Sequence, residues 1–214
     1  VVSSPYGDGT YNVKYSSYYS NTNYSPHYIF SKPSNEPNTS QPSNDSTWAS
    51  NYNNGNYVGS SSLNSISGDW ITIQMPIKIL LTKYVFVSVH NTSGHNNRLP
   101  RKYSILGCND DDGNWEVIYS ETLNQDNDSD YTDTYYGISN IARIVNIPEN
   151  SRLTGTKTFN TFGLIVEKIG RVSVLAIAEW DIFGKEDNIS AVSIYSSNST
   201  DEFIYPPYRY FTYD

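Results

Sequence analysis

Apolar and polar residues alternate along the middle of the chain with the spacing of a half-buried β-strand. Over 70–75 this alternation places Ile71, Ile73 and Met75 on one face, and Pro76 is expected to end the strand. Other segments are rich in β-branched and aromatic residues and also predict strands. They are 79–89, 102–108, 115–119, 141–147, 162–167 and 172–182.

Polar segments rich in Gly, Asn, Asp or Pro separate these strands. Residues 31–46 contain three prolines, and 51–67 and 121–136 are polar as well, so all three are predicted to be loops. Tight turns are expected at 109–114 and 168–171. No stretch keeps a helical period. The pattern therefore predicts an all-β antiparallel sandwich or jelly roll over 1–184 and an extended, Tyr-rich C-terminal arm over 185–214.

Composition narrows the possible partners. The formal net charge is −8, and an acidic surface repels phosphate backbones, so a nucleic acid is not expected to bind. The chain contains no run of eighteen apolar residues, so no membrane-spanning helix is predicted. Cys108 is the single cysteine, which rules out an internal disulfide and predicts a small buried side chain in a strand. A catalytic thiol would need a nearby base, and only three histidines are present.

Four segments carry a family resemblance in order along the chain. They are 46–50 (STWAS), 68–76 (GDWITIQMP), 103–115 (YSILGCNDDDGNW) and 178–184 (AEWDIFG). Together they resemble the discoidin, or coagulation factor 5/8 type C, domain of the galactose-binding-like class. Their wording is most similar to discoidin-like domains in surface and capsid-associated proteins of large DNA viruses. The resemblance implies a discoidin-like jelly roll. Trp70, Trp115 and Trp180 each fall at a strand position and are expected to be core or rim anchors, with a ligand platform as the alternative.

The resemblance also implies that the ligand loops cluster at one end of the sandwich. Here those loops are 31–56, 90–101 and 125–136. Aromatic rings and planar polar groups suit sugars, although each such residue is otherwise an ordinary surface residue. The predicted ligand-binding residues are Trp48, Tyr52, Tyr57, His90, His95, Arg98, Tyr135 and Tyr136.

Carbohydrate-binding members of the family hold a structural calcium ion with an early-loop Asp, a Thr and the Glu of the last strand. Thr47 and Glu179 match the last two, whereas Ser31 stands at the acidic position. Calcium prefers several anionic oxygens, so no cofactor is expected, and Glu179 is alternatively an acid that closes loop amides. The acidic loop at 126–133 lacks the Gly and Glu of an EF-hand and is expected to be solvated.

No nucleophile elbow, zinc-protease, phosphate-loop or dinucleotide motif occurs, so no enzyme is predicted. The first hypothesis is a viral structural or attachment protein, such as a minor capsid, spike or fibre component within a larger assembly. Its partners would be other capsid or surface proteins or host glycans, and its place the virion surface or the extracellular space. The alternatives are a stand-alone carbohydrate-binding lectin module and a non-catalytic module of a larger secreted protein.

Overall fold

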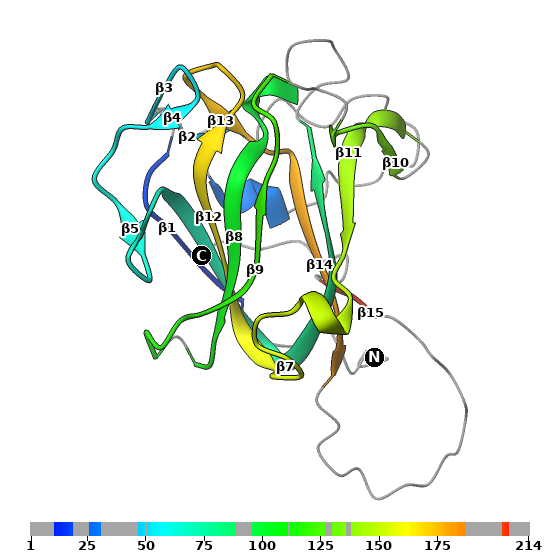
Figure 1. The fold of residues 1–214 in the computed structure, drawn as a ribbon. Coiled ribbons are helices and arrows are strands. Elements are labelled where there is room, and N and C mark those ends of the chain that lie inside the picture. Colours follow the sequence, from blue (N-terminus) through cyan, green and yellow to red (C-terminus); the bar gives the residue numbers. More distant parts are fainter. Residues whose placement is uncertain are drawn as a thin grey trace, which may run out of the picture.

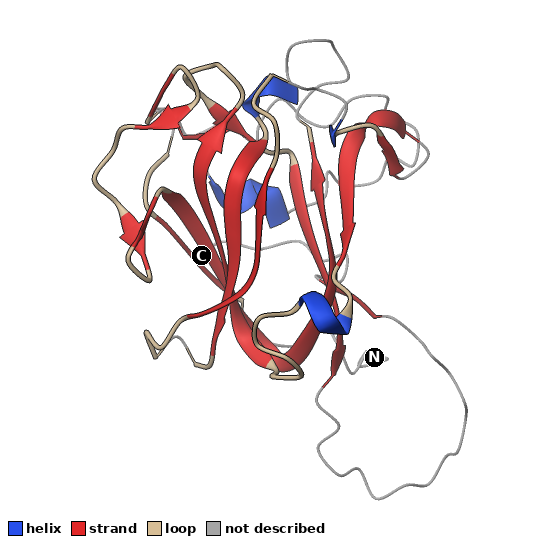
Figure 2. Ribbon diagram, in the orientation of Figure 1, coloured by secondary structure: helices blue, strands red, loops and turns tan. Residues whose placement is uncertain are grey.

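The computed structural model describes residues 11–18, 26–30, 47–49, 51–88, 96–110, 112–126, 130–135, 138–186 and 203–205. These residues form two layers of antiparallel strands with a few short 3-10 helices (Figures 1 and 2). The longer strands are β1 (Asn12–Tyr15), β7 (Asp69–Val87), β8 (Pro100–Cys108), β9 (Glu116–Thr122), β11 (Ile138–Asn146), β12 (Phe159–Ile169) and β14 (Glu179–Glu186). Within the described part of the chain, no helix is long and apolar enough to cross a membrane.

Strand β7 belongs to both layers. Its first half pairs with β1 and β12, and its second half pairs with β11 and β14. The first layer continues from β12 to β8 and β9. The second layer continues from β11 to β10 (Asp133–Tyr135) and from β14 to β15 (Phe203–Tyr205). This arrangement is an antiparallel jelly-roll sandwich, which confirms the predicted fold class.

The strand that was expected to end at Pro76 continues through it, so that prediction is wrong. Pro76 is exposed inside β7, where the chain crosses from one layer to the other. Pairing with β1 stops at Gln74, and pairing with β12 jumps from Gln74 to Ile79. Proline has no backbone N–H to donate, and neither β1 nor β12 pairs with residue 76, so its missing donor costs no hydrogen bond to these strands.

The core lies between the two layers. The predicted apolar face is confirmed, because Ile71, Ile73 and Met75 are all buried in it. Trp180 is fully buried and lies beside two other rings, with centroids 5.5 Å from Phe30 and 6.4 Å from Phe86. Trp180 therefore anchors the interior, as the sequence predicted.

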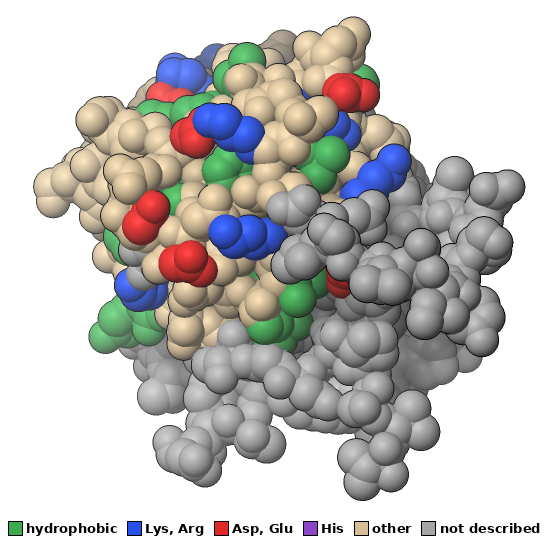
Figure 3. Space-filling model, turned by 90° about the horizontal axis from the view of Figure 1, so that it is seen from below, with side chains coloured by type: hydrophobic (Ala, Val, Ile, Leu, Met, Phe, Trp, Pro, Cys, Tyr) green, Lys and Arg blue, Asp and Glu red, His purple; other side chains and the backbone are tan. Residues whose placement is uncertain are grey.

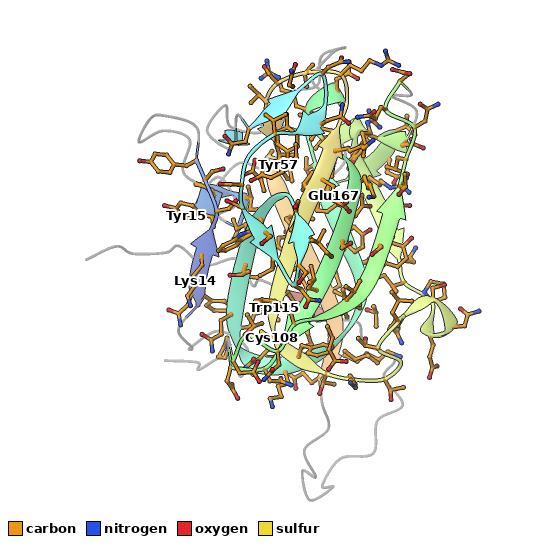
Figure 4. All side chains as sticks on the ribbon, turned by 60° about the vertical axis from the view of Figure 1, so that its left-hand side comes forward. Lys14, Tyr15, Tyr57, Cys108, Trp115 and Glu167 are labelled. Atoms are coloured by element: carbon orange, nitrogen blue, oxygen red, sulfur yellow. The ribbon has the colours of Figure 1, made fainter. Side chains whose placement is uncertain are left out.

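The other two predicted tryptophan anchors, Trp70 and Trp115, lie outside this core. Trp70 alternates with the inward Ile71 and is partly exposed. Trp115 lies low on the first layer in Figure 4, and a Cβ on Gly163 would be 3.1 Å from its Cζ3 atom. Leu63 is equally close, at 3.0 Å. Trp115 and Leu63 thus cover the outer face of β12, and glycine leaves room for them.

Residues 51–67, predicted as one loop, contain two small hairpins. They are β3 (Tyr52–Asn53) with β4 (Asn56–Tyr57), and β5 (Ser62–Leu63) with β6 (Ile66–Ser67). Asn54 and Gly55 turn the first hairpin with φ values of 45° and 76°. Two consecutive positive φ values are the geometry of a two-residue hairpin turn, for which Asn-Gly is a preferred sequence.

Two other predicted boundaries also change. The segment 172–182 is divided between β13 (Leu175–Ala176), which pairs with β2 (Thr47–Ala49), and β14. The supposed loop over 121–136 includes the end of β9 and all of β10. The turn at 109–114 is confirmed, with positive φ at Asp110 and Gly113. Cys108 is buried in β8, as expected.

Candidate functional site

Four connections meet at one end of the sandwich, at the top of Figure 1. We call it the loop end; it comprises the β3–β4 turn, the 3-10 helix η3 (Asn96–Arg98), residues 123–126 and the turn after β12. The Gly55 amide donates to Val172 O, and the Ile169 amide donates to Gly55 O, both at 2.9 Å. The β3–β4 turn is therefore fixed to the end of β12 by its backbone.

Gln125 and Asn97 complete this contact. Gln125 Nε2 donates to Ile169 O at 2.9 Å and to Gly55 O at 3.4 Å. The backbone of Asn97 lies so close to Gly170 that a Cβ there would be 2.5 Å from Asn97 O. Parts of the three predicted ligand loops, represented by Gly55, Asn97 and Gln125, are thus brought together around the turn after β12.

The side chains at the rim of the loop end are polar and end in planar groups. Asn53, Asn54 and Asn56 are exposed on the β3–β4 hairpin, and Arg98 ends η3 in a partly exposed position. Arg171 Nη2 donates to Asp126 Oδ2 at 2.7 Å on the surface. Amide, guanidinium and carboxylate groups on a fixed backbone are suited to bidentate hydrogen bonds with neighbouring hydroxyl groups.

Asp130 and Tyr131 fix the third predicted loop, 125–136, to the sandwich. Arg143 Nη1 donates to Asp130 O at 3.1 Å, and the fully buried Arg101 guanidinium lies 3.8 Å from the Asp130 carboxylate. The Arg101 Cζ atom lies over the Tyr131 ring, 5.0 Å from the ring centroid. The Tyr131 hydroxyl donates to Pro100 O at 2.5 Å. Burial raises the pKa of Tyr131, so the hydroxyl stays protonated and keeps donating.

A buried polar chain runs from this anchor into the core. Arg143 Nε donates to Glu121 Oε2 at 3.1 Å, and the same carboxylate accepts from the Tyr103 hydroxyl. The Tyr103 and Tyr84 hydroxyls are 2.8 Å apart. Burial works against the Arg143 charge, but hydrogen bonding and attraction from Glu121 raise the pKa of Arg143 above its ordinary value. Burial also raises the pKa of Tyr103.

The structure places some of the predicted ligand residues. Arg98 lies at the loop end. Tyr52 is buried and its hydroxyl donates to Val166 O at 2.9 Å, so its ring packs in the core. Tyr57 is half-buried, and its hydroxyl accepts from the Ser61 amide at 2.8 Å. Figure 4 labels Tyr57 near the loop end.

The remaining predicted residues are placed only in part. Thr47 and Trp48 lie in β2, and Tyr135 in β10, but their side chains are outside the described residues, as are His90, His95 and Tyr136. Glu179 is buried at the start of β14. Among the side chains that the structure describes, no group of three or more His, Cys, Asp or Glu is arranged to hold a metal ion.

Several residues of the loop end were not predicted. Asn97, Gln125, Gly170 and Arg171 act through contacts with distant segments. The Asn54-Gly55 pair is the one local signal that could have located the rim, because it predicts a hairpin turn.

Comparison with known proteins gives no family assignment from sequence. No protein-family model matches the chain, and no curated protein matches it.

Solved structures give likenesses at low identity. A family 32 carbohydrate-binding module from Clostridium perfringens, in complex with GalNAc-β-1,3-galactose, is 11% identical, with a TM-score of 0.46 over 80% of this chain and 94% of that one. The family 32 module of C. perfringens NanJ, in complex with galactose, is 13% identical, with a TM-score of 0.45 over 80% and 92%. Chitosan-binding module 1 of a Paenibacillus chitosanase/glucanase is 12% identical, with a TM-score of 0.46 over 84% and 96%.

Proposed function

We propose that the chain is a non-catalytic binding module whose loop end holds a glycan. The observation that carries this proposal is the interlocked backbone around Gly55, Ile169 and Val172, which fixes the polar rim before any ligand arrives. A fixed site loses little conformational entropy on binding. The planar groups of the three exposed asparagines, Arg98 and the Arg171–Asp126 pair suit the adjacent hydroxyls of a sugar.

The same features support binding over catalysis. Asp126, the acid described at the rim, is exposed, and an exposed carboxylate lacks the apolar surround that prepares a general acid. The rim instead offers many weak hydrogen bonds. Such a site binds without changing its ligand.

A glycan array on the chain Val1–Asp214 tests the proposal, and the best glycan then serves for titration. Replacing Arg98 by Ala removes a guanidinium from the rim and is expected to weaken binding about tenfold, or about 1.4 kcal/mol. Arg98→Lys keeps the charge but loses the planar fork, so it should recover little affinity.

Lys78→Ala is the matched control, because Lys78 is exposed in β7 near the crossing between layers and its loss also removes one positive charge. It should bind as the unmodified chain does. An array without a binder, or an Arg98→Ala variant with unchanged affinity, would contradict the proposal.

We further propose that the module works at the surface of a large virus particle, or in the extracellular space, as a capsid, spike or fibre component. The four motifs support the viral setting through their resemblance. The C-terminal segment supports a docking role, because β15 adds a strand beside Ile182, Phe183 and Gly184 of β14. Extended segments also bind between chains in this way. Co-purification of the chain with particle proteins would support this setting, and its isolation as a free monomer would argue against it.

A further inference from the structure

The end of the sandwich opposite the loop end has a hollow of its own. We call this the hairpin end; it comprises the β8–β9 turn and the loop that leads into β12, at the bottom of Figure 1. The hollow is open to solvent and measures about 510 Å³. It is lined by Asn109, Glu116, Thr156, Lys157, Thr158 and Phe159.

The walls of this hollow are held in place by hydrogen bonds. Asp110 has a left-handed φ of 56°, and its amide donates to Asn160 Oδ1 at 2.7 Å. Asn160 Nδ2 donates in return to Asp110 Oδ1 at 2.6 Å. The loop that carries Thr156 is joined to β9, because the Leu153 amide donates to Ile118 O at 2.9 Å. Both walls are therefore formed before a ligand binds, which lowers the entropic cost of binding.

The chemistry of the hollow favours an uncharged ligand. Lys157 Nζ and Glu116 Oε2 form an ion pair at 2.5 Å, so each charge at the mouth already has its counter-charge. Figure 3 views the hairpin end from below and shows acidic and basic side chains interspersed over its described part, without a field of one sign. An ionic ligand would gain no net attraction there.

The remaining groups match hydroxyls. Thr156 and Thr158 contribute hydroxyl side chains, and Asn109 contributes an amide whose Oδ1 is shielded and has no hydrogen-bond partner among the described residues. Buried polar atoms are almost always hydrogen-bonded in folded proteins. A ligand with several hydroxyl groups supplies both donors and acceptors to such a wall, and Phe159 forms the apolar floor.

We propose that the hairpin end is a second binding site, for a neutral polyhydroxylated ligand of the size of one sugar unit. This site uses none of the residues of the loop end. The proposal therefore does not depend on glycan binding at the loop end. With both sites the module contacts hydroxyl-rich material at two opposite ends, and two weak sites on one rigid body bind a multivalent surface more tightly than either alone.

The test uses the full chain labelled with ¹⁵N and titrated with galactose, glucose and N-acetylgalactosamine in turn. At least one sugar is expected to shift the amide signals of Asn109 and of Thr156 to Thr158 saturably, with a dissociation constant of about 1–10 mM, the range of weak single-site binding. No saturable shift at these residues with any of the three sugars would overturn the proposal.

A double variant, Thr156→Val with Lys157→Gln, should weaken this binding at least tenfold while leaving the rest of the spectrum in place, since both side chains are exposed. Lys78→Ala is the matched control, because it also removes one exposed positive charge but lies outside the lining of the hollow, so it should leave the hairpin-end shifts intact. Arg98→Ala, at the loop end, separates the two sites. Shifts that survive in the double variant would refute the site. Shifts that vanish only in Arg98→Ala would assign the sugar to the loop end and refute it as well.

Discussion

Asp69 shows how one buried side chain positions three segments. Its carboxylate is fully buried, and Oδ1 accepts from Ser17 Oγ at 2.6 Å, Ser16 Oγ at 3.0 Å and Asn51 Nδ2 at 3.2 Å. The end of β1 and the start of β3 are thereby joined to the start of β7. Tyr15, exposed just before this junction, points away from the sheet in Figure 4.

The ionisation of Asp69 should leave a mark on stability. Burial raises the pKa of Asp69, and the hydrogen bonds from Ser17, Asn51 and Ser16 only partly offset it. A carboxyl whose pKa is higher in the folded state binds its proton more tightly there. Its contribution to stability is therefore complete below the ordinary pKa of 3.8 and is lost as the pH rises through the raised value.

Asp69→Asn removes this titration. Compared with the variant, the unmodified chain should gain unfolding free energy as the pH falls from 7 towards 4. Urea unfolding of both proteins at several pH values measures the difference. Parallel stability curves across that range would show that Asp69 has no raised pKa.

At the scale of elements, the β3–β4 hairpin depends on close approach to its neighbours. Gly55 has a φ of 76°, and a Cβ there would lie 2.3 Å from Gly170 O and 2.6 Å from Ile169 O. Gly113 has a similar φ of 80° but no atom within 4 Å of the same position. The two glycines share the backbone strain that alanine would feel, and only Gly55 adds a collision.

Gly113→Ala should therefore cost about 1–2 kcal/mol, the ordinary penalty of a left-handed residue. Gly55→Ala should cost clearly more and should also reduce binding at the loop end, because the hairpin must move away from β12. Denaturant unfolding and glycan titration of the two variants provide the comparison. Equal losses of stability would mean that the hairpin is not locked.

The sequence predicted those elements whose pattern is local. The face of Ile71, Ile73 and Met75 follows from alternation, and the turn at 109–114 follows from residues that tolerate positive φ. The passage through Pro76 was missed because it depends on where β1 and β12 stop pairing. The small hairpins of 51–67 were missed because their strands are two residues long and show no alternation.

The candidate site was predicted only in outline. The resemblance indicated that three loops cluster, and their described parts do meet. The individual contacts could not be inferred, because Gln125 reaches Gly55 across 70 positions of sequence. Tyr52 reads as a loop residue in the sequence and is buried in the core, where its hydroxyl reaches Val166.

For the whole molecule, one long side of the sandwich is closed by side chains. Strand β9 ends the first layer on this side and β11 lies in the second, and among the described residues no backbone pairing joins them. Glu121 of β9 and Arg143 of β11 bridge the two instead, with side chains 15% and 20% exposed. A half-buried pair at this position holds the layers together along a side where the backbone does not.

Arg143→Met leaves Glu121 shielded and without its counter-charge, so it should destabilise the fold by about 3 kcal/mol, at the low end of the range for broken buried pairs. The additional change Glu121→Gln should restore part of that loss. Lys157→Met, in a pair whose side chains are 59% and 43% exposed, is the control and should cost less than about 1 kcal/mol. Thermal unfolding of the variants measures these losses of stability. Similar losses for Arg143→Met and Lys157→Met would show that the Glu121–Arg143 bridge does not hold the layers together.

The shared strand β7 has a consequence for how this molecule comes apart. A sandwich of two separate sheets can melt one layer and keep the other. Here β7 is a strand of both layers, because it pairs with β1 and β12 in one and with β11 and β14 in the other. If β7 detaches from one layer, the other layer is disrupted as well. Opening is thus cooperative across the whole body, and a ligand held at one end protects backbone amides at the far end.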